Sequence, residues 1–197
     1  QAEQFDKNKR HHHLLIFAAL IPYMHVKRKS GDRARSGLMQ AVSIRDTQLQ
    51  EYMLHRSVFC RRVADGLSSA YAALPPSLKS HSEEQDRVAQ SALDEFVRRL
   101  EFARDLCLKA GEEGPGVGGA GPADKSKAAR GGGGDLADAI CREVRERFVE
   151  DRLRPALMTV SEAGQTAATV YTHTIIQTLC ATPKPYNPLL NVIVRSL

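Results

Sequence analysis

Apolar residues recur along this chain at intervals of three and four positions, and strict alternation of apolar and polar residues is almost absent. This spacing matches the 3.6-residue turn of an α-helix, so it predicts an all-α fold. The clearest examples are Phe59–Leu74 and Val88–Cys107, where the apolar side chains would line one face of each helix. Because such a stripe normally faces a core, we expect its members to be buried, Val88 included.

Capping residues and prolines mark where the expected helices begin and end. Side chains at a helix start accept the free backbone N–H groups, and proline suits the first turn because no donor is needed there. On these signals the chain divides into about eight helices. The expected starts are about Lys9, Asp32, Thr47, Ser57, Ser82, Asp135, Ser161 and Pro188, and Pro75–Pro76 and Arg154–Pro155 end two of the helices.

The short loops expected between these helices favour antiparallel neighbours. Stacked antiparallel hairpins are the architecture of an α-solenoid, which is the predicted fold, and a compact helical bundle is the alternative. Residues 1–197 are expected to form one domain. The chain lacks an initiating methionine, and its last residues, Leu189–Leu197, begin an apolar stripe that would need further chain to cover it. We therefore expect a fragment of a longer protein.

A glycine-rich segment, residues 111–134, interrupts the helical pattern. It holds ten of the chain's 14 glycines, and such a polar sequence cannot offset its own ordering entropy. We expect a flexible, disordered insertion between two helices. Within it, Gly119–Ser126 resembles a phosphate-binding loop, but Asp124 replaces the second glycine and no strand precedes it. Nucleotide binding is therefore not expected there.

The spacing of the cysteines and histidines gives no sign of a metal-binding or catalytic site. Cys60, Cys107, Cys141 and Cys180 lie far apart and form no CxxC pair, which predicts reduced thiols in a cytoplasmic protein. The His11–His13 run is expected to be a solvated helix start, and no histidine belongs to an HExxH motif. We predict no catalytic residue, no cofactor-binding residue and no metal ligand, and hence not an enzyme.

A basic loop is the one surface feature that predicts a partner. Five cations stand against one acid, Asp32, so the local charge is +4. Such a cluster can bind anionic lipid or an acidic protein surface, and a solubilising loop between helices is the alternative interpretation. The candidate binding residues are Lys27, Arg28, Lys29, Arg33 and Arg35.

Charge and hydropathy also limit the kinds of partner. The formal net charge is +5, and no aromatic side chains are interleaved with the basic loop, so nucleic acid is not an expected partner. The longest apolar run, Leu14–Met24, is shorter than the ~20 residues that span a bilayer and contains Pro22. Any membrane contact is therefore expected to be peripheral.

Several helix-packing segments follow one another in a fixed order along the chain. They are Arg33–Ser43, Leu49–Tyr52, Phe59–Pro75 and Leu93–Ala103, followed by Phe148–Leu157 and Gln165–Tyr171. This ordered series resembles the Hook-interacting protein family, the FHIP or retinoic-acid-induced-16-like proteins, and the last two segments are less similar to it. No single segment is diagnostic, so the order of the series carries the resemblance. The glycine-rich insertion departs from the family pattern, and the His11–Lys29 region matches it less well.

The resemblance implies a non-catalytic adaptor with an α-solenoid fold, a subunit of the FTS–Hook–FHIP complex. Such a protein would link a Hook-type dynein adaptor and the FTS subunit to membrane cargo. It would be cytoplasmic, peripheral on endosomes or other vesicles, with a Rab GTPase as a further partner. No residue here is assigned to Hook, FTS or Rab contact. The alternatives are a generic armadillo- or HEAT-like scaffold in another trafficking or signalling assembly and, as a third, an enzyme.

Overall fold

The computed structural model describes residues 14–44, 46–79, 82–111, 133–181 and 187–197. Every regular element in these ranges is helical, so the all-α prediction is confirmed. None of these helices combines the length and the apolar character needed to cross a membrane. After a helical segment over residues 14–20 come η1 (Ile21–Tyr23), α2 (Lys29–Ser43), α3 (Thr47–Glu51), η2 (Tyr52–Arg56), α4 (Phe59–Ala72), α5 (Glu83–Gly111), α6 (Gly133–Val144), η3 (Arg145–Leu153), α7 (Arg154–Leu157), α8 (Glu162–Cys180) and α9 (Pro188–Ser196).

Some sequence predictions fall outside the described residues. These are the solvated His11–His13 run, the helix start at Lys9, and the flexible insertion apart from its two ends, including Gly119–Ser126. The expectation of a disordered insertion therefore stays a prediction.

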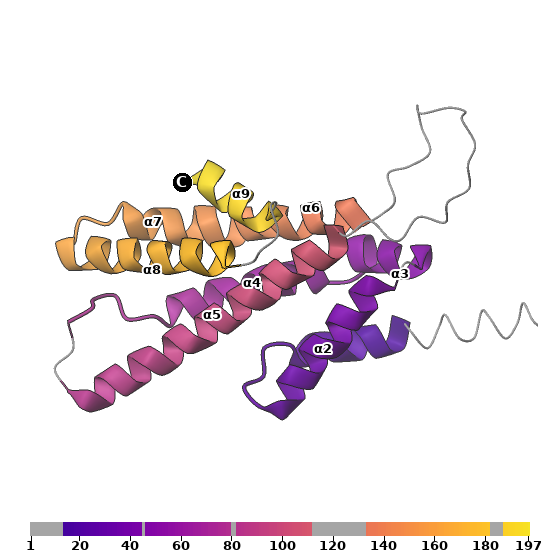
Figure 1. Ribbon diagram of the computed structural model, residues 1–197, viewed down its shortest axis with the longest axis horizontal. Helices are drawn as coiled ribbons and strands as arrows, with labels where there is room; N and C mark the ends of the chain where they lie inside the picture. Colours follow the sequence, from indigo (N-terminus) through magenta and orange to yellow (C-terminus); the bar gives the residue numbers. More distant parts are fainter. Residues whose placement is uncertain (1–13, 45, 80–81, 112–132, 182–186) are drawn as a thin grey trace, which may run out of the picture.

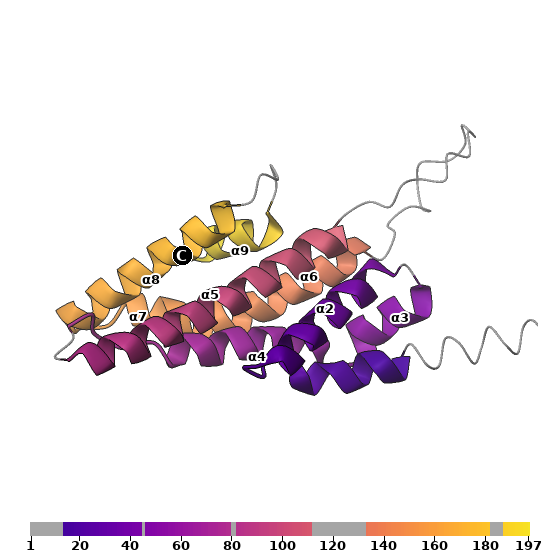
Figure 2. The same cartoon turned by 60° about the horizontal axis from the view of Figure 1, so that its bottom comes forward.

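Helix α5 runs along most of the length of the molecule (Figures 1 and 2). It contacts α2, α4, α6, α8 and α9. Helices α4 and α5 form one antiparallel hairpin, and α8 turns back after α7 and packs against α7 and α5 (Figure 2). Antiparallel hairpins fit a solenoid, whereas the mutual packing of α4, α5 and α6 also fits a compact bundle. The stacking of further hairpins stays a prediction.

The core is centred on a cluster of aromatic rings. The Tyr71 ring of α4 lies 5.7 Å from Phe96 of α5, 5.5 Å from Phe148 of η3 and 6.2 Å from Tyr171 of α8, each in an edge-to-face arrangement. The rings of Phe96 and Phe148 are 6.0 Å apart. Edge-to-face pairs add to the free energy gained by burial alone, so this aromatic cluster joins four helical segments at one point.

Side-chain caps place several helix starts where the sequence predicted them. The Ser161 hydroxyl accepts the N–H of Gly164 at 3.3 Å at the start of α8. Ser82 accepts the N–H of Gln85 at 3.3 Å at the start of α5, which is one half of the predicted capping box. Asn187 caps α9 and also donates to the Leu179 carbonyl at 2.9 Å, so it ties α9 to the end of α8.

Other predicted boundaries are wrong by a few residues. Helix α2 begins at Lys29, three positions before Asp32, whose carboxylate lies within the first turn. Asp46 rather than Thr47 caps α3, and its side chain accepts the N–H of Leu49 at 2.9 Å. Helix α6 begins at Gly133 rather than Asp135. The Asp46 carboxylate takes the cap that Thr47 was expected to fill, whereas no side chain caps the start of α2.

Pro155 does not end the sixth predicted helix. The chain stays helical from Gly133 through Leu157, and the stretch before the proline, η3, is a π-helix. A π-helical turn widens the backbone and shifts its hydrogen-bond ladder, which accommodates a residue that has no N–H to donate.

The apolar stripe of α9 is partly covered by the chain's own helices. Leu189 and Ile193 are fully buried, and α9 contacts α5, α6, η3 and α8. Val194 is 53% exposed and Leu197 is 45% exposed. The expectation that this stripe would be left uncovered is therefore wrong for Leu189 and Ile193, whereas Val194 and Leu197 are uncovered in the structure.

Replacing the central ring tests the aromatic cluster. We expect Tyr71→Ala to lower the free energy of unfolding by about 3–5 kcal/mol, the usual cost of removing a large buried ring. Urea denaturation followed by circular dichroism measures this change. Tyr23→Ala is the matched control, because Tyr23 is an exposed tyrosine and its loss should change stability by less than about 0.5 kcal/mol. Equal losses in the two variants would contradict a central role for the cluster.

Candidate interaction surfaces

Four of the five predicted binding residues lie together on the surface. Lys27 and Arg28 are exposed in the loop before α2, and Lys29 and Arg33 are exposed in its first two turns. We call these four residues the basic surface. Cations at a helix N-terminus are disfavoured by the helix dipole, so folding alone does not explain their position there.

Arg35 lies beneath this surface, with 8% of its area exposed. Its Nη1 donates to the Met24 carbonyl at 2.7 Å, and its Nη2 lies 2.5 Å from the Asp32 carboxylate. Both interactions fix the loop against α2. Arg35 therefore shapes the basic surface and does not present its charge there, and Asp32 is occupied with it.

His25 anchors the other side of the same loop. Its Nε2 lies 2.7 Å from the Arg62 carbonyl of α4. The ring lies directly against Gly66, where a Cβ atom would overlap it, so a residue without a side chain is required at this close approach. No residue of the described chain forms a hydrogen bond with the buried Nδ1 of His25.

A buried ion pair on α5 also holds this loop in place. Glu95 is 6% exposed, and its carboxylate accepts a hydrogen bond from Arg99 Nε at 2.7 Å. Arg99 also donates to the Gly66 carbonyl at 2.8 Å and to the Ser69 hydroxyl at 3.1 Å, both on α4, and to the His25 carbonyl at 3.4 Å. These contacts join α4, α5 and the loop that carries the basic surface. Sequence reasoning missed them, because the partners lie 30 or more positions from Arg99.

The His25 imidazole is held neutral by its surroundings. Burial lowers its pKa below the usual 6.5, and the nearby positive charges of Arg99, Arg35 and Arg62 lower the pKa further. The hydrogen bond with the Arg62 carbonyl opposes this shift in pKa, because a carbonyl oxygen attracts the positively charged ring more strongly than the neutral one.

The basic surface continues onto α5. Lys27 lines a cavity of about 340 Å³ together with Arg87 and Arg98. Asp94 and Glu95 line the same cavity, and Glu95 pairs with Arg98 at 3.3 Å. This cavity is mixed in charge, whereas the four residues of the basic surface carry only positive charge.

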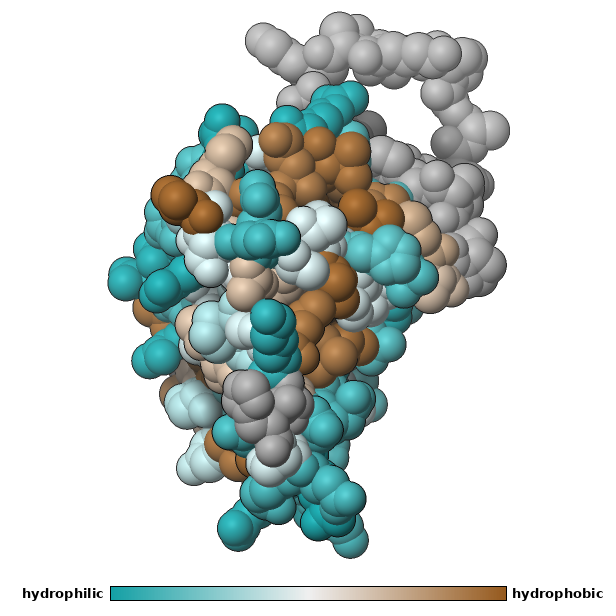
Figure 3. All heavy atoms as spheres, turned by 90° about the vertical axis from the view of Figure 1, so that its left-hand side faces the viewer, coloured by the Kyte–Doolittle hydropathy of each residue, from teal (hydrophilic) through white to brown (hydrophobic). Residues whose placement is uncertain are grey.

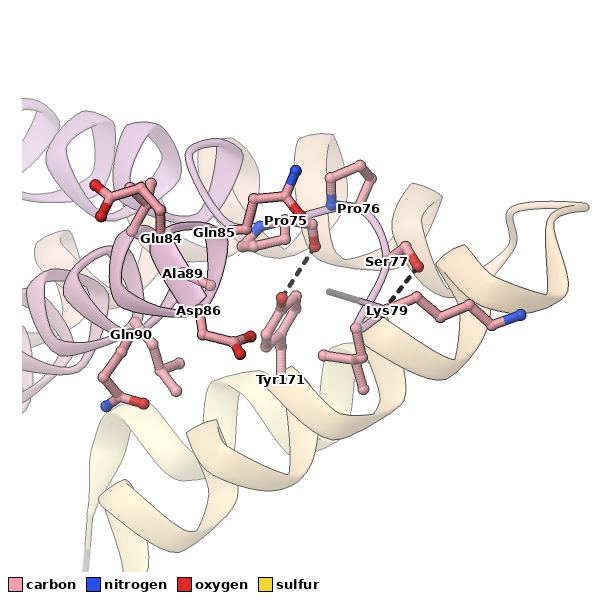
Figure 4. A pocket seen from close by; sticks show the side chains of 13 residues that line it. Pro75, Pro76, Ser77, Lys79, Glu84, Gln85, Asp86, Ala89, Gln90 and Tyr171 are labelled. Carbon is pink, nitrogen blue, oxygen red and sulfur yellow. Dashed lines mark hydrogen bonds between the residues drawn. The ribbon is translucent and has the colours of Figure 1, made fainter. Parts of the chain in front are cut away.

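A larger cavity lies on another face of the first turns of α5 (Figure 4). It has a volume of about 730 Å³ and lies between the residues 75–79 segment, α5 and α8. A second cavity of about 360 Å³ adjoins it through Pro75, Pro76 and Tyr171. The Tyr171 hydroxyl donates to the Pro75 carbonyl at 2.9 Å and so holds α8 against the segment after α4. We call these two cavities the apolar groove.

Exposed apolar side chains line this groove. Val88 is 62% exposed and Leu78 is 48% exposed, so the expectation that Val88 faces the core is wrong. The core positions of α5 begin at Glu95 and Phe96, and the turns before them extend past the aromatic cluster. The view onto this end of the molecule shows apolar side chains at the surface between polar ones (Figure 3).

Two of the three buried cysteines, Cys60 and Cys107, are unsuited to nucleophilic chemistry. Burial raises the pKa of Cys60 to about 12. The Sγ atoms of Cys107 and Cys141 are 3.9 Å apart in the core, and this contact together with burial raises the pKa of Cys107 well above its usual value. Thiols that stay protonated at neutral pH are poor nucleophiles. The proximity of Cys107 and Cys141 was not visible in the sequence, where they are 34 positions apart.

Comparison with known proteins places the chain in one protein family. The profile of the family described as "Retinoic acid induced 16-like protein" matches residues 1–194. The chain is 32% identical over 96 residues to human FHF complex subunit HOOK-interacting protein 1A and 30% identical over 97 residues to the rat 1B protein. A FHIP family protein of Drosophila mojavensis is 29% identical over 106 residues.

These matches cover a small part of the relatives. They span 45% of this chain and 9% of the human protein, 45% of this chain and 12% of the rat protein, and 50% of this chain and 10% of the fly protein.

Acidification should weaken the contact between His25 and α4. In the unfolded chain the His25 side chain takes up a proton near pH 6.5, whereas in the folded chain its pKa is lower. The contribution of His25 to the free energy of unfolding is therefore fully present above pH 6.5 and is lost as the pH falls below 6.5. We expect His25→Gln, whose amide can still donate to the Arg62 carbonyl, to flatten this decline between pH 7.5 and 5. Urea midpoints across that range measure it. His55→Gln, at an exposed histidine, is the control and should keep the wild-type slope; a wild-type slope in His25→Gln would refute the assignment.

Proposed function

The chain belongs to the retinoic acid induced 16-like family, and on that premise we propose that it acts as a non-catalytic adaptor. In this proposal it binds a Hook-type dynein adaptor and the FTS subunit and links them to vesicle or endosome cargo in the cytoplasm. A Rab GTPase on the vesicle is a further proposed partner. The family match over residues 1–194 is the observation that carries the proposal, and the relatives named as HOOK-interacting subunits support it.

The surface chemistry fits a protein that binds more than one partner. The apolar groove and the mixed-charge cavity that Lys27 of the basic surface lines lie on different faces of α5, and Gln90 lines both cavities. Two surfaces that differ in charge and polarity favour two different ligands. The raised pKa values of the Cys60 and Cys107 thiols support a role without covalent catalysis at these two residues.

For the basic surface we propose contact with anionic lipid headgroups. Each basic residue near a charged bilayer contributes about 1 kcal/mol to binding. The buried Arg35 and Glu95–Arg99 interactions hold the loop in place, so less conformational freedom would be lost when it binds. Exposed lysine and arginine side chains can reach several headgroups at once.

Affinity capture of the full-length protein from its own cytosol tests the adaptor role. We expect a Hook-type coiled-coil protein and the FTS subunit to co-purify with it in constant proportion. Recovery of other partners, reproducibly and without these two, would contradict the proposal and favour a generic helical scaffold in another assembly.

Vesicle flotation tests the basic surface separately. We expect the combined Lys27→Glu, Arg28→Glu and Lys29→Glu variant to bind vesicles containing phosphatidylserine at least about 100-fold more weakly, since about 3 kcal/mol is removed. Binding of the unchanged protein should also weaken with added salt.

The combined Arg142→Glu, Arg152→Glu and Arg154→Glu variant is the matched control. These three arginines are exposed on the α6–η3–α7 segment, and the charge change is the same. Equal loss of flotation in both variants would show that binding depends only on net charge. Unchanged flotation of the Lys27→Glu, Arg28→Glu and Lys29→Glu variant would show that the basic surface does not contact the membrane.

A further inference from the structure

The apolar stripe of α5 continues beyond the part that the chain itself covers. Phe96 is fully buried, Ala92 one turn earlier is half-buried, and Val88 two turns earlier is exposed. The three residues are spaced four apart and so lie on one helical face. The stripe therefore leads from the aromatic cluster into the apolar groove, where Val88 and Leu93 line the cavity of about 730 Å³. Another apolar stripe laid along it would continue the packing of the core.

The walls of the groove favour a helical ligand over an extended one. Two walls are the helices α5 and α8, whose backbone groups are already paired within each helix. The third wall contains Pro75 and Pro76, which have no N–H to donate, and the Pro75 carbonyl already accepts from Tyr171. An extended peptide would lose its water hydrogen bonds without finding new ones here, whereas a helix satisfies its own backbone.

The charges at the groove favour a cationic partner. Asp86 lines the cavity and points toward the Tyr171 ring (Figure 4). Glu84 also lines the cavity, but its carboxylate points away from Tyr171 (Figure 4), and neither carboxylate forms an ion pair within the described parts of the chain. Among the described residues that line this cavity, Lys79 is the only cation, and its side chain extends away from Tyr171 (Figure 4). A lysine or arginine beside an apolar anchor would neutralise Asp86 at the edge of the groove, where the pair is partly desolvated.

We propose that the apolar groove binds an amphipathic helix of a partner protein that carries lysine or arginine side chains beside its apolar stripe. Apolar side chains of this helix insert between Val88, Leu93 and Tyr171, and its cations lie against Asp86. The inference goes beyond the adaptor proposal and does not rest on it, because neither the basic surface nor the Hook and FTS partners enter the argument.

A model peptide of this chemistry tests the proposal on the full chain. The probe is a fluorescent peptide of about 18 residues, roughly 27 Å long as a helix, with leucine on one face and lysine on the other. Fluorescence anisotropy measures its affinity. We expect saturable one-to-one binding that weakens at least tenfold in Val88→Asp and severalfold in Asp86→Asn. The chain's net charge of +5 disfavours binding of this peptide elsewhere.

Two controls make the result decisive. A peptide with glutamate in place of each lysine should bind at least tenfold more weakly. Leu15→Asp, at an exposed leucine on the residues 14–20 helix, should leave the affinity unchanged, and circular dichroism confirms that each variant is folded. Equal binding of both peptides, or equal loss in Val88→Asp and Leu15→Asp, would overturn the proposal. So would self-association of the chain, seen by sedimentation, that Val88→Asp abolishes.

Discussion

Edge-to-face packing around the Tyr71 ring sets the arrangement of the described helices. Phe96, Phe148 and Tyr171 reach this ring from α5, η3 and α8, so one side chain of α4 positions three other segments. The place of the contact along α5 has a consequence for the surface. Phe96 lies more than three turns from the start of α5, so the first turns extend past the core and leave part of their apolar stripe for the groove.

Local patterns predicted the elements, and long-range contacts decided the rest. The 3.6-residue period and the caps at Ser82 and Ser161 predicted an all-α fold and the starts of α5 and α8. The same period predicted that Val88 is buried. This prediction is wrong, because burial also requires another helix to pack against that turn of α5. Arg35 looks like its basic neighbours in sequence, yet Met24 and Asp32 hold it below the surface.

Family membership and surface chemistry together favour an adaptor. Helix α5 lies between the apolar groove and the mixed-charge cavity lined by Lys27, which belongs to the rigidly anchored basic surface. The anchor uses His25, Gly66, Glu95 and Arg99, which no local motif relates to one another. Two ligands of unlike chemistry can then bind at the same time without competing for one site. That capacity is what a link between cargo and transport machinery requires.

A bridging experiment tests the adaptor account most directly. Vesicles containing phosphatidylserine are floated with a purified Hook-type coiled-coil protein and FTS, in the presence or absence of the full-length protein. The account predicts that the Hook-type protein floats only when the full-length protein is present, and that the Lys27→Glu, Arg28→Glu and Lys29→Glu variant no longer carries it. Flotation of the Hook-type protein without the full-length protein, or none in its presence, would contradict the account.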